Sequence, residues 1–416
     1  MDRLVIDDLE LNGKRVLTRV DFNVPIKDGK VVDDTRIQAA VPTIKKIVSD
    51  GGRLILMSHL GRPKGEVDKQ LSLKPVAARL GELIDKKVKM AGDCVGPGVQ
   101  KMVEGLANGD ILLLENTRFH KEETANDPEF AKQLAESGEV FVNDAFGAVH
   151  RAHASTVGIT KHLKESAAGY LLQSEVENLT RLLEDPEKPF VVILGGAKVS
   201  DKLKVIRNLV TKVSALCVGG GMAYTFLKAK GVAVGDSLLD DERVAMANNV
   251  MVVANNPHPY KRFAFLLPLD HVVAKSTDES DYNIDETVNI PAGWKGVDIG
   301  PKTIAEFKAH INEAKSVFWN GPMGIFENDN FAKGTIEIAR TVADATARGA
   351  FTVVGGGDSI AAIENAGMKD KISHVSTGGG ASLEFMAGID LPGIMALSKA
   401  KKKPVAKPVP EEAAAE

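Results

Sequence analysis

Short apolar runs alternate with longer amphipathic segments along most of this chain of 416 residues. In the first half, four runs are almost continuously apolar up to a polar end, a pattern typical of strands buried on both faces of a sheet: residues 15–22, 53–59, 111–115 and 140–145. Between them, three segments repeat apolar residues with helical spacing: residues 35–50, 74–85 and 128–138. Asp34 and Gly51 are placed to cap the first of these helices.

A long helical segment, residues 170–189, interrupts the alternation and ends at a charged turn bounded by prolines. After it the apolar runs resume, and each is expected to be followed by a helix: residues 190–196, 215–221, 263–273, 316–322 and 350–357. Regular strand–helix alternation predicts parallel sheets covered by helices on both faces. The simplest architecture is therefore an α/β chain of two similar halves joined by one helix.

The charge and cysteine content restrict the functional classes. The formal net charge is −4, which argues against a general nucleic-acid or membrane-surface binder. Cys94 and Cys217 lie far apart and in no C-x-x-C pair, which argues against a disulfide framework or a zinc site and fits a reducing compartment. We find no targeting peptide and no apolar run of membrane-spanning length. Residues 399–416 lack core-forming residues and are predicted to be a disordered tail.

Glycine-bearing segments follow the predicted strands of the second half, at residues 194–202, 219–226, 319–327, 355–363 and 376–382. Ligands of open parallel sheets bind beyond the carboxyl ends of the strands. One glycine cluster fits a tight turn equally well, but five at equivalent positions favour a phosphate-bearing ligand. Neither G-x-x-x-x-G-K-[ST] nor the G-x-G-x-x-G fingerprint of dinucleotide-binding enzymes is present.

Four side chains sharpen the prediction for the second half. Lys198 and Lys202 lie four residues apart at the expected start of a helix, where both can face one anion. Asp358 follows three glycines and fits either a helix N-cap or a Mg²⁺ ligand. Glu327 fits either a contact to a ribose hydroxyl or a cap of the next segment.

The first half places basic and polar residues where its strands end. Arginines occur at four strand-to-helix transitions and suggest a site for a small polyanion: Arg36, Arg62, Arg118 and Arg151. Asp21 and Asn23 are candidates to bind a substrate hydroxyl, and His59 to orient a substrate group. His150 and His153 match no zinc spacing, and no G-x-S-x-G nucleophile motif is present.

These segments resemble the phosphoglycerate kinase family. Eight motifs carry the resemblance, in this order within residues 15–382: RVDFNVP, SHLGRPKG, ENTRFH, NDAFGAVHRAHAST, LGGAKVSDK, WNGPMGIFE, GGGDS and HVSTGGGAS. The resemblance implies two Rossmann-like three-layer α/β/α domains with parallel sheets, joined by a hinge helix. The implied boundaries are 1–169 for the glycerate-binding domain, 170–188 for the hinge helix, 189–388 for the nucleotide-binding domain, and 389–398 for a segment that packs back on the first domain.

The resemblance also implies the reaction, a reversible phosphoryl transfer between 1,3-bisphosphoglycerate and ADP that gives 3-phosphoglycerate and ATP, with Mg²⁺ as cofactor. A cytoplasmic monomer is implied, with only small-molecule partners. By motif match the glycerate site would comprise Asp21, Phe22, Asn23, Arg36, His59, Leu60, Gly61, Arg62, Arg118 and Arg151. The nucleotide site would comprise Ala197, Lys198, Lys202, Gly220, Gly296, Asn320, Glu327, Gly356, Gly357, Asp358 and Ser359, with Asp358 nearest the metal.

Such a transfer needs charge neutralisation and no proton abstraction, because the acceptor carboxylate is already ionised at neutral pH. We expect Arg36, Lys202 and the backbone N–H groups of Gly378 and Gly379 to surround the moving group, and Lys198 to bridge it to the nucleotide phosphates. Residues 378–380 would then be glycine because a side chain would block this approach. The alternatives are a two-domain NAD-dependent dehydrogenase, which lacks its fingerprint here, and a non-catalytic scaffold, which would have lost some of these cations.

Overall fold

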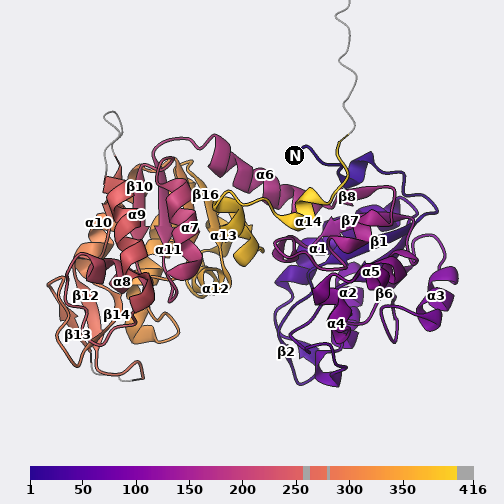
Figure 1. Cartoon of the computed structure of the whole chain (residues 1–416), viewed down its shortest axis with the longest axis horizontal. Coiled ribbons are helices and arrows are strands. Elements are labelled where there is room, and N and C mark those ends of the chain that lie inside the picture. The colour runs from indigo at the N-terminus through magenta and orange to yellow at the C-terminus, as the bar shows by residue number, and fades with distance from the viewer. Residues whose placement is uncertain (256–262, 279–281, 401–416) are drawn as a thin grey trace, which may run out of the picture.

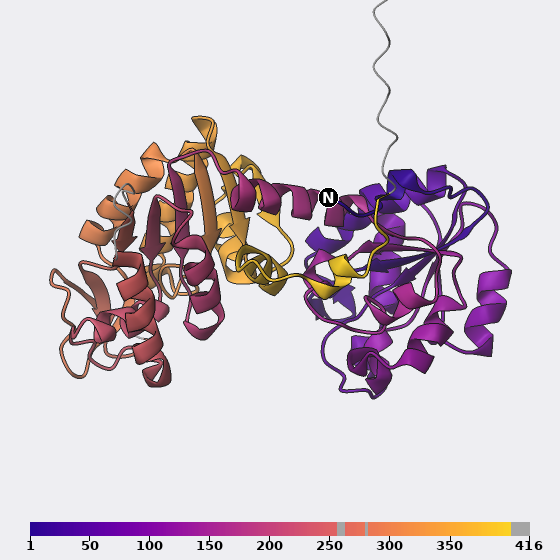
Figure 2. The ribbon, with the colours of Figure 1, turned by 45° about the horizontal axis from the view of Figure 1, so that its top comes forward.

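The computed structural model describes residues 1–255, 263–278 and 282–400, apart from the side chains of Asp201 and Asn255. Figures 1 and 2 show two lobes connected by helix α6 (Tyr170–Glu184), with the first half of the chain in one lobe and most of the second half in the other. Each lobe is built on its own six-stranded parallel sheet, so the predicted α/β class is confirmed.

The sheet of the first lobe is entirely parallel. Its order is β5 (Val88–Met90), β6 (Ile111–Leu113), β4 (Arg53–Met57), β1 (Arg15–Val20), β7 (Val140–Asp144) and β8 (Ser166–Ala168). Its helices are α1 (Thr35–Ser49), α2 (Lys74–Ile84), α3 (Pro97–Glu104), α4 (Lys121–Ala125) and α5 (Pro128–Ala135). The four predicted strands all form, and each ends one or two residues before the end of the predicted run.

Helices cover both faces of this sheet because successive strand residues point to opposite sides. Val16 of β1 and its partner Leu54 of β4 belong to the cluster that packs on α1 and α2. The next pair, Leu17 and Ile55, belongs to the cluster that packs on α3 and α5. Continuous apolar strands therefore produce three layers.

The second lobe repeats this plan with another parallel sheet. Its order is β11 (Ala264–Leu266), β10 (Ala215–Val218), β9 (Phe190–Leu194), β15 (Ser316–Asn320), β16 (Phe351–Gly355) and β17 (His374–Ser376). Its helices are α7 (Ser200–Leu209), α8 (Met222–Ala229), α9 (Val244–Asn255), α10 (Pro301–Glu313), α11 (Lys333–Ala347), α12 (Gly357–Asn365) and α13 (Gly380–Met386). Alternate strand residues pack on α10 and α11 or on α7 and α8.

The prediction of a single strand over residues 263–273 is wrong. This run forms β11 at the edge of the large sheet and then β12 (His271–Ala274), the centre of a separate antiparallel sheet with β13 (Tyr282–Asp285) and β14 (Lys295–Ile299). Pro268, which has no N–H to donate to a sheet, lies between the two strands. The helix that was expected after residue 273 does not form, and the next element that the structure describes is β13.

Other expectations also need correction. The strands β5, β8 and β17 and the short hairpin of β2 (Ile26–Lys27) and β3 (Lys30–Val31) were not predicted, because two or three residues are too few to show an alternating pattern. Asp34 precedes α1 but makes no side-chain capping bond. Its carboxylate instead accepts hydrogen bonds from Arg79 (2.8 Å) and Gln38 (2.6 Å).

The chain returns to the first lobe at its C-terminal end, where α14 (Pro392–Met395) lies beside that lobe in Figure 1. The Gly393 N–H donates to the Val149 carbonyl (2.8 Å), and the Ser398 N–H donates to the Ser166 carbonyl in β8 (2.9 Å). Lys399 and Ala400, which were placed in the predicted tail, pair with Arg3 and Asp2. The rest of that tail, residues 401–416, lies outside the described residues.

Candidate active site

The predicted glycerate-site residues of the first lobe follow the carboxyl ends of β1, β4, β6 and β7, and Arg36 lies in the first turn of α1. Arg36 Nη1 donates to Asp21 Oδ2 (3.1 Å) and to the Asn23 carbonyl (3.2 Å). Asn23 Oδ1 in turn accepts from the Gly61 N–H (2.8 Å) in the loop after β4. Loops that are distant in sequence are therefore held together at one edge of the sheet.

Arg118 joins the same loops, because its Nη1 donates to the Gly61 carbonyl at 2.8 Å. Its side chain is buried, and its Nε has no hydrogen-bond partner. Burial, with Arg19 and Arg151 nearby, lowers the pKa of Arg118 to about 10. A pocket lined by Arg62, Arg118 and Arg151 opens here. An unpaired buried guanidinium N–H among like charges suits an anionic ligand.

Two buried histidines at this site, His59 and His153, are neutral at pH 7. Burial and the Arg19 charge hold the pKa of His59 well below its usual range, and burial and Arg118 lower the pKa of His153 to about 4. The Nδ1 of His59 is 2.9 Å from Nη2 of Arg19 and must accept this hydrogen bond, so the proton of a neutral His59 is on Nε2. His59 and His153 therefore add no positive charge to the site, which comes from the arginines and from Lys64 and Lys121 of the pocket.

The glycine loops of the second lobe bond to one another at the carboxyl edge of its sheet. The Gly196 N–H donates to the Pro322 carbonyl (2.8 Å), and the Gly220 N–H donates to the Met323 carbonyl (3.0 Å). Asn320 Nδ2 donates to the Gly355 carbonyl (2.8 Å), which adds the loop after β16. Four of the five glycine-bearing segments thus form one continuous surface.

Polar side chains of the nucleotide-site prediction lie on or beside this surface. Lys198 is exposed in the loop before α7, and Lys202 is buried in the first turn of that helix. Ser359 is buried, and its Oγ accepts from the Gly321 N–H (2.5 Å). Ala197 is exposed in the same loop as Lys198.

The structure excludes the capping roles considered for Asp358 and Glu327. The N-cap of α12 is Gly356, so Asp358 lies inside the first turn with an exposed side chain and is not the cap. The next segment after Glu327 is capped by Asn328, which leaves Glu327 exposed and without a capping role. Gly296 lies further along in β14, where the neighbouring Val297 carbonyl accepts from the Ile325 N–H (2.9 Å).

A cleft between the lobes brings part of the two sets together. It is lined by Asn23 and Arg36 from the first lobe and by Gly357, Thr377 and Gly379 from the second. Lys198 and Lys202 are not part of its lining. The described arrangement therefore places Arg36 and the triple-glycine loop on one cleft and leaves the two lysines outside it.

The explanation offered for the triple glycine needs revision. A Cβ on Gly378 would lie 2.2 Å from Cε1 of Phe146, so this glycine is required for packing against the first lobe. A Cβ on Gly379 would meet nothing within 4 Å, but the residue has φ +49° and ψ −103°, a conformation that favours glycine. Packing thus requires a glycine at residue 378, and backbone conformation favours one at residue 379.

The sequence matches the family model for phosphoglycerate kinase over residues 6–389. The chain belongs to the phosphoglycerate kinase family. Curated phosphoglycerate kinases from Chloroherpeton thalassium and Moorella thermoacetica are 54% and 53% identical to it, over 96% of this chain and 100% of each relative. Solved phosphoglycerate kinase structures from Coxiella burnetii and Pyrococcus horikoshii each give a TM-score of 0.82, at 40% and 33% identity, and cover 95% of this chain and 98% of theirs.

As a phosphoglycerate kinase family member, the protein is a phosphotransferase with a carboxyl group as acceptor. It moves a phosphoryl group reversibly between 1,3-bisphosphoglycerate and ADP, which gives 3-phosphoglycerate and ATP, a step of glycolysis. The predicted enzyme class is confirmed, and the dehydrogenase and scaffold alternatives are wrong. Within the described residues, no helix is both long and apolar enough to cross a membrane.

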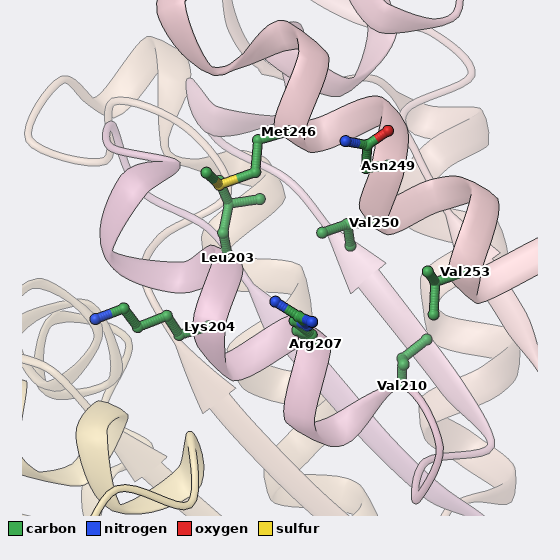
Figure 3. Close-up of a pocket in the computed structure, with 8 residues that line it drawn as sticks. All are labelled: Leu203, Lys204, Arg207, Val210, Met246, Asn249, Val250 and Val253. Atoms are coloured by element: carbon green, nitrogen blue, oxygen red, sulfur yellow. The ribbon is translucent and has the colours of Figure 1, made fainter.

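A separate groove in the second lobe is not part of this kinase site. It runs between α7 and α9, and Figure 3 shows the side chains that line it: Leu203, Lys204, Arg207, Val210, Met246, Asn249, Val250 and Val253. None of these residues was predicted to bind substrate. Five of its eight lining residues are apolar, and the three polar ones were assigned to neither substrate.

Two buried residues at the site were missed by sequence reasoning. Arg19 is fully buried in β1, and its Nε donates to Ser155 Oγ at 2.8 Å. Glu175 of α6 accepts from the Thr377 N–H (2.6 Å) and lies 2.8 Å from Nε2 of His374. An arginine inside an apolar run was a usable signal for the first, because a charge in a buried strand needs a partner. Nothing local in the sequence signals the second.

Proposed function

We propose that the two lobes hold the two substrates separately and that the transfer occurs when the lobes close. The proposed domains are 1–169 with 389–398 for the glycerate, 170–188 as the hinge, and 189–388 for the nucleotide. The observation that carries this proposal is the arrangement of arginines at one sheet edge and glycine loops with lysines at the other. Charge that comes from two lobes can surround one group only if the lobes approach.

In the first domain, the arginine pocket is proposed to bind the phosphate and carboxylate of 3-phosphoglycerate. The polar contacts would come from Asp21, Asn23, Arg36, His59, Arg62, Arg118 and Arg151. The unpaired Nε of buried Arg118 supports this assignment, because an anion would satisfy it. His59, with its proton on Nε2, would donate a hydrogen bond and accept none there.

In the second domain, the joined glycine loops are proposed to bind ADP or ATP. Backbone N–H groups of Gly356 and Gly357 lie at the start of α12, where a helix favours an anion. Lys198 and Lys202 supply the cationic side chains. Closure would bring Arg36 toward these lysines, so that the oxygens of the moving phosphoryl group are neutralised from both sides.

Mg²⁺ is proposed to bind with the nucleotide at Asp358. The fit is chemical, because Mg²⁺ prefers carboxylate oxygens together with phosphate and the exposed Asp358 carboxylate does not cap its helix. When bound, Mg²⁺ would neutralise charge on the nucleotide phosphates. The remaining steps depend on this chain's own residues, which orient the substrates and exclude water on closure.

The protein is further proposed to act as a cytoplasmic monomer. Both cysteines are buried and free, and thiols of this kind are usual in a reducing compartment. Sedimentation of the purified chain tests the monomer directly, and a dimer at micromolar concentration would contradict it.

Calorimetric titration with 3-phosphoglycerate and with ADP tests whether each lobe binds one of the two substrates. Arg118→Ala should weaken 3-phosphoglycerate binding by about 10-fold or more, the loss typical of a hydrogen bond to a charged group, and leave ADP binding unchanged. Lys202→Ala should do the reverse. Lys230→Ala, an exposed lysine of the second lobe, serves as the matched control. If either variant binds both 3-phosphoglycerate and ADP more weakly, the proposal of separate sites is contradicted.

A coupled assay with ATP and 3-phosphoglycerate, with and without Mg²⁺, tests the metal. Turnover should require Mg²⁺, and Asp358→Asn should raise the Mg²⁺ concentration needed for half-maximal rate. An unchanged Mg²⁺ requirement would remove Asp358 from the metal site.

A further inference from the structure

A cluster of three different metal-ligating side chains lies in the first lobe beside the arginine pocket, which His120 also lines, and none of the three was assigned to a substrate. Asp93 and Cys94 follow β5, and His120 lies between the short turn Thr117–Phe119 and α4. One ligand atom from each of the three residues lies within 4.8 Å of the other two. Phosphoryl transfer uses none of these groups.

The fold already holds the three side chains in place. Asp93 Oδ1 is 2.7 Å from Nε2 of His120 and accepts the Cys94 N–H at 2.6 Å. The Asp93 carbonyl accepts the Glu115 N–H at 3.3 Å, and the His120 ring lies 5.1 Å from the ring of Phe130. The Asp93–His120 hydrogen bond and the packing of His120 on Phe130 thus hold the three side chains close together before an ion binds.

The charge and access of the cluster also suit a cation. The neighbouring Asp93 and Glu123 carboxylates make the surroundings of Cys94 negative, which favours a positive ion. Cys94 is fully buried, whereas the Asp93 and His120 side chains are 52% and 28% exposed. An ion can therefore enter from the solvent side and meet the sulfur at the inner end.

We propose that Asp93, Cys94 and His120 form a binding site for one Zn²⁺-class divalent cation. Sulfur, imidazole nitrogen and carboxylate oxygen together select a borderline metal over Mg²⁺ or Ca²⁺. Zinc bonds of about 2.0–2.3 Å at tetrahedral angles place ligand atoms about 3.5 Å apart, which lies within the observed spacing. The Asp93–His120 hydrogen bond opens, and the His120 ring proton moves from Nε2 to Nδ1 by exchange with solvent, which frees Nε2 for the metal. The Cys94 thiol releases its proton to solvent as the sulfur–metal bond forms, and water fills the fourth position.

Cobalt titration of the full-length, chelator-treated protein tests the site, because Co²⁺ reports thiolate ligation by a sulfur-to-metal charge-transfer band. We expect one equivalent of Co²⁺ to produce this band. Zn²⁺ should displace the Co²⁺ and remove the band, whereas excess Mg²⁺ should leave the band unchanged. Cys94→Ala should abolish the band. Cys217→Ala, which removes the other buried cysteine, should keep it.

His120→Gln provides a second test that does not disturb a fully buried position. We expect it to weaken Co²⁺ and Zn²⁺ binding about 10-fold or more, as loss of one of three protein ligands should. A band that persists in Cys94→Ala, that is lost in Cys217→Ala, or that is unaffected in His120→Gln would overturn the proposal. Failure to bind one equivalent would do the same and would leave the kinase assignment untouched.

Discussion

Arg36 is the side chain on which the proposed transfer depends most. Its guanidinium is held by Asp21 and Asn23 and faces the cleft between the lobes. The same ion pair that orients the side chain leaves other N–H groups of the guanidinium free to meet a phosphoryl oxygen. A role in the transition state predicts a larger effect on kcat than on the binding of either ground-state substrate.

Arg36→Ala should lower kcat by about 10²–10³-fold, the loss typical of one donor to developing negative charge, and leave the Kd of ADP unchanged. Steady-state kinetics in the coupled assay and calorimetry with ADP measure the two quantities. Arg340→Ala removes an exposed arginine that pairs with Glu337 and should leave both unchanged. If kcat is retained in Arg36→Ala, this arginine does not act in the transition state.

Gly379 tests the backbone of the triple-glycine loop. Gly379→Val should cost about 1–3 kcal/mol of stability because of the positive φ, and should reduce turnover to near zero because the loop can no longer present its N–H groups. Thermal unfolding and the coupled assay measure the two effects. Gly105→Ala has an ordinary φ of −83° and should affect neither. A fully active Gly379→Val would show that the loop conformation is irrelevant to the transfer.

At the scale of elements, α6 is coupled to the triple-glycine loop through one buried carboxylate. Glu175 accepts from both the N–H (2.6 Å) and the hydroxyl (2.8 Å) of Thr377, the residue before the first glycine. A rotation of α6 therefore displaces this loop. The helix that joins the domains is also the support of part of the proposed site.

Glu175→Ala should destabilise the protein by about 1–3 kcal/mol, because it leaves buried donors unpaired. It should also lower kcat more than it changes either Kd, because the loop loses its support while the substrate pockets remain. Urea unfolding and kinetics measure this. Glu177→Ala, on the exposed side of α6, is the matched control. Equal losses in both variants would show a general effect on the helix.

Asp298 connects β14 to α11 and makes stability depend on pH. Its carboxylate accepts from the Gly334 N–H (2.6 Å) and the Ile299 N–H (2.9 Å), while burial raises its pKa to about 8. A carboxyl with a raised folded-state pKa stabilises the fold fully below its unfolded value, near 3.8, and loses this contribution as pH rises through its folded value.

The free energy of unfolding of the wild type should therefore fall relative to that of Asp298→Asn as the pH rises from about 5 to about 8, by up to about 1.4 kcal/mol per pH unit. Urea unfolding of both proteins at several pH values measures the difference. The change between pH 8.5 and 9.5 should be smaller, because the carboxylate is then largely ionised in both states. A difference that is independent of pH would show that Asp298 does not titrate in this range.

At the scale of the whole molecule, the two lobes share one continuous apolar cluster although their sheets are separate. The cluster includes Leu17 of β1, Leu172 of α6 and Val192 of β9. The C-terminal segment also crosses from the second lobe to the first. The proposed closure would therefore be a movement about these shared elements.

Binding of both substrates should make the molecule more compact than binding of either alone, because only the ternary complex draws cations from both lobes toward one group. Small-angle X-ray scattering of the free protein, with 3-phosphoglycerate, with MgADP and with both together measures this. The radius of gyration should be smallest in the last sample. Identical scattering in all four samples would contradict closure in solution.

The amino-acid sequence by itself determined the α/β class, the positions of the principal strands and helices, and the loops that carry the proposed substrate residues. It did so because apolar periodicity, proline and glycine act over a few neighbouring residues. Tertiary structure alone decided that 263–273 divides between two sheets, that Gly378 packs on Phe146, and that Glu175 meets Thr377. These contacts join residues that are distant in sequence, and their energies depend on how complete layers and lobes pack together.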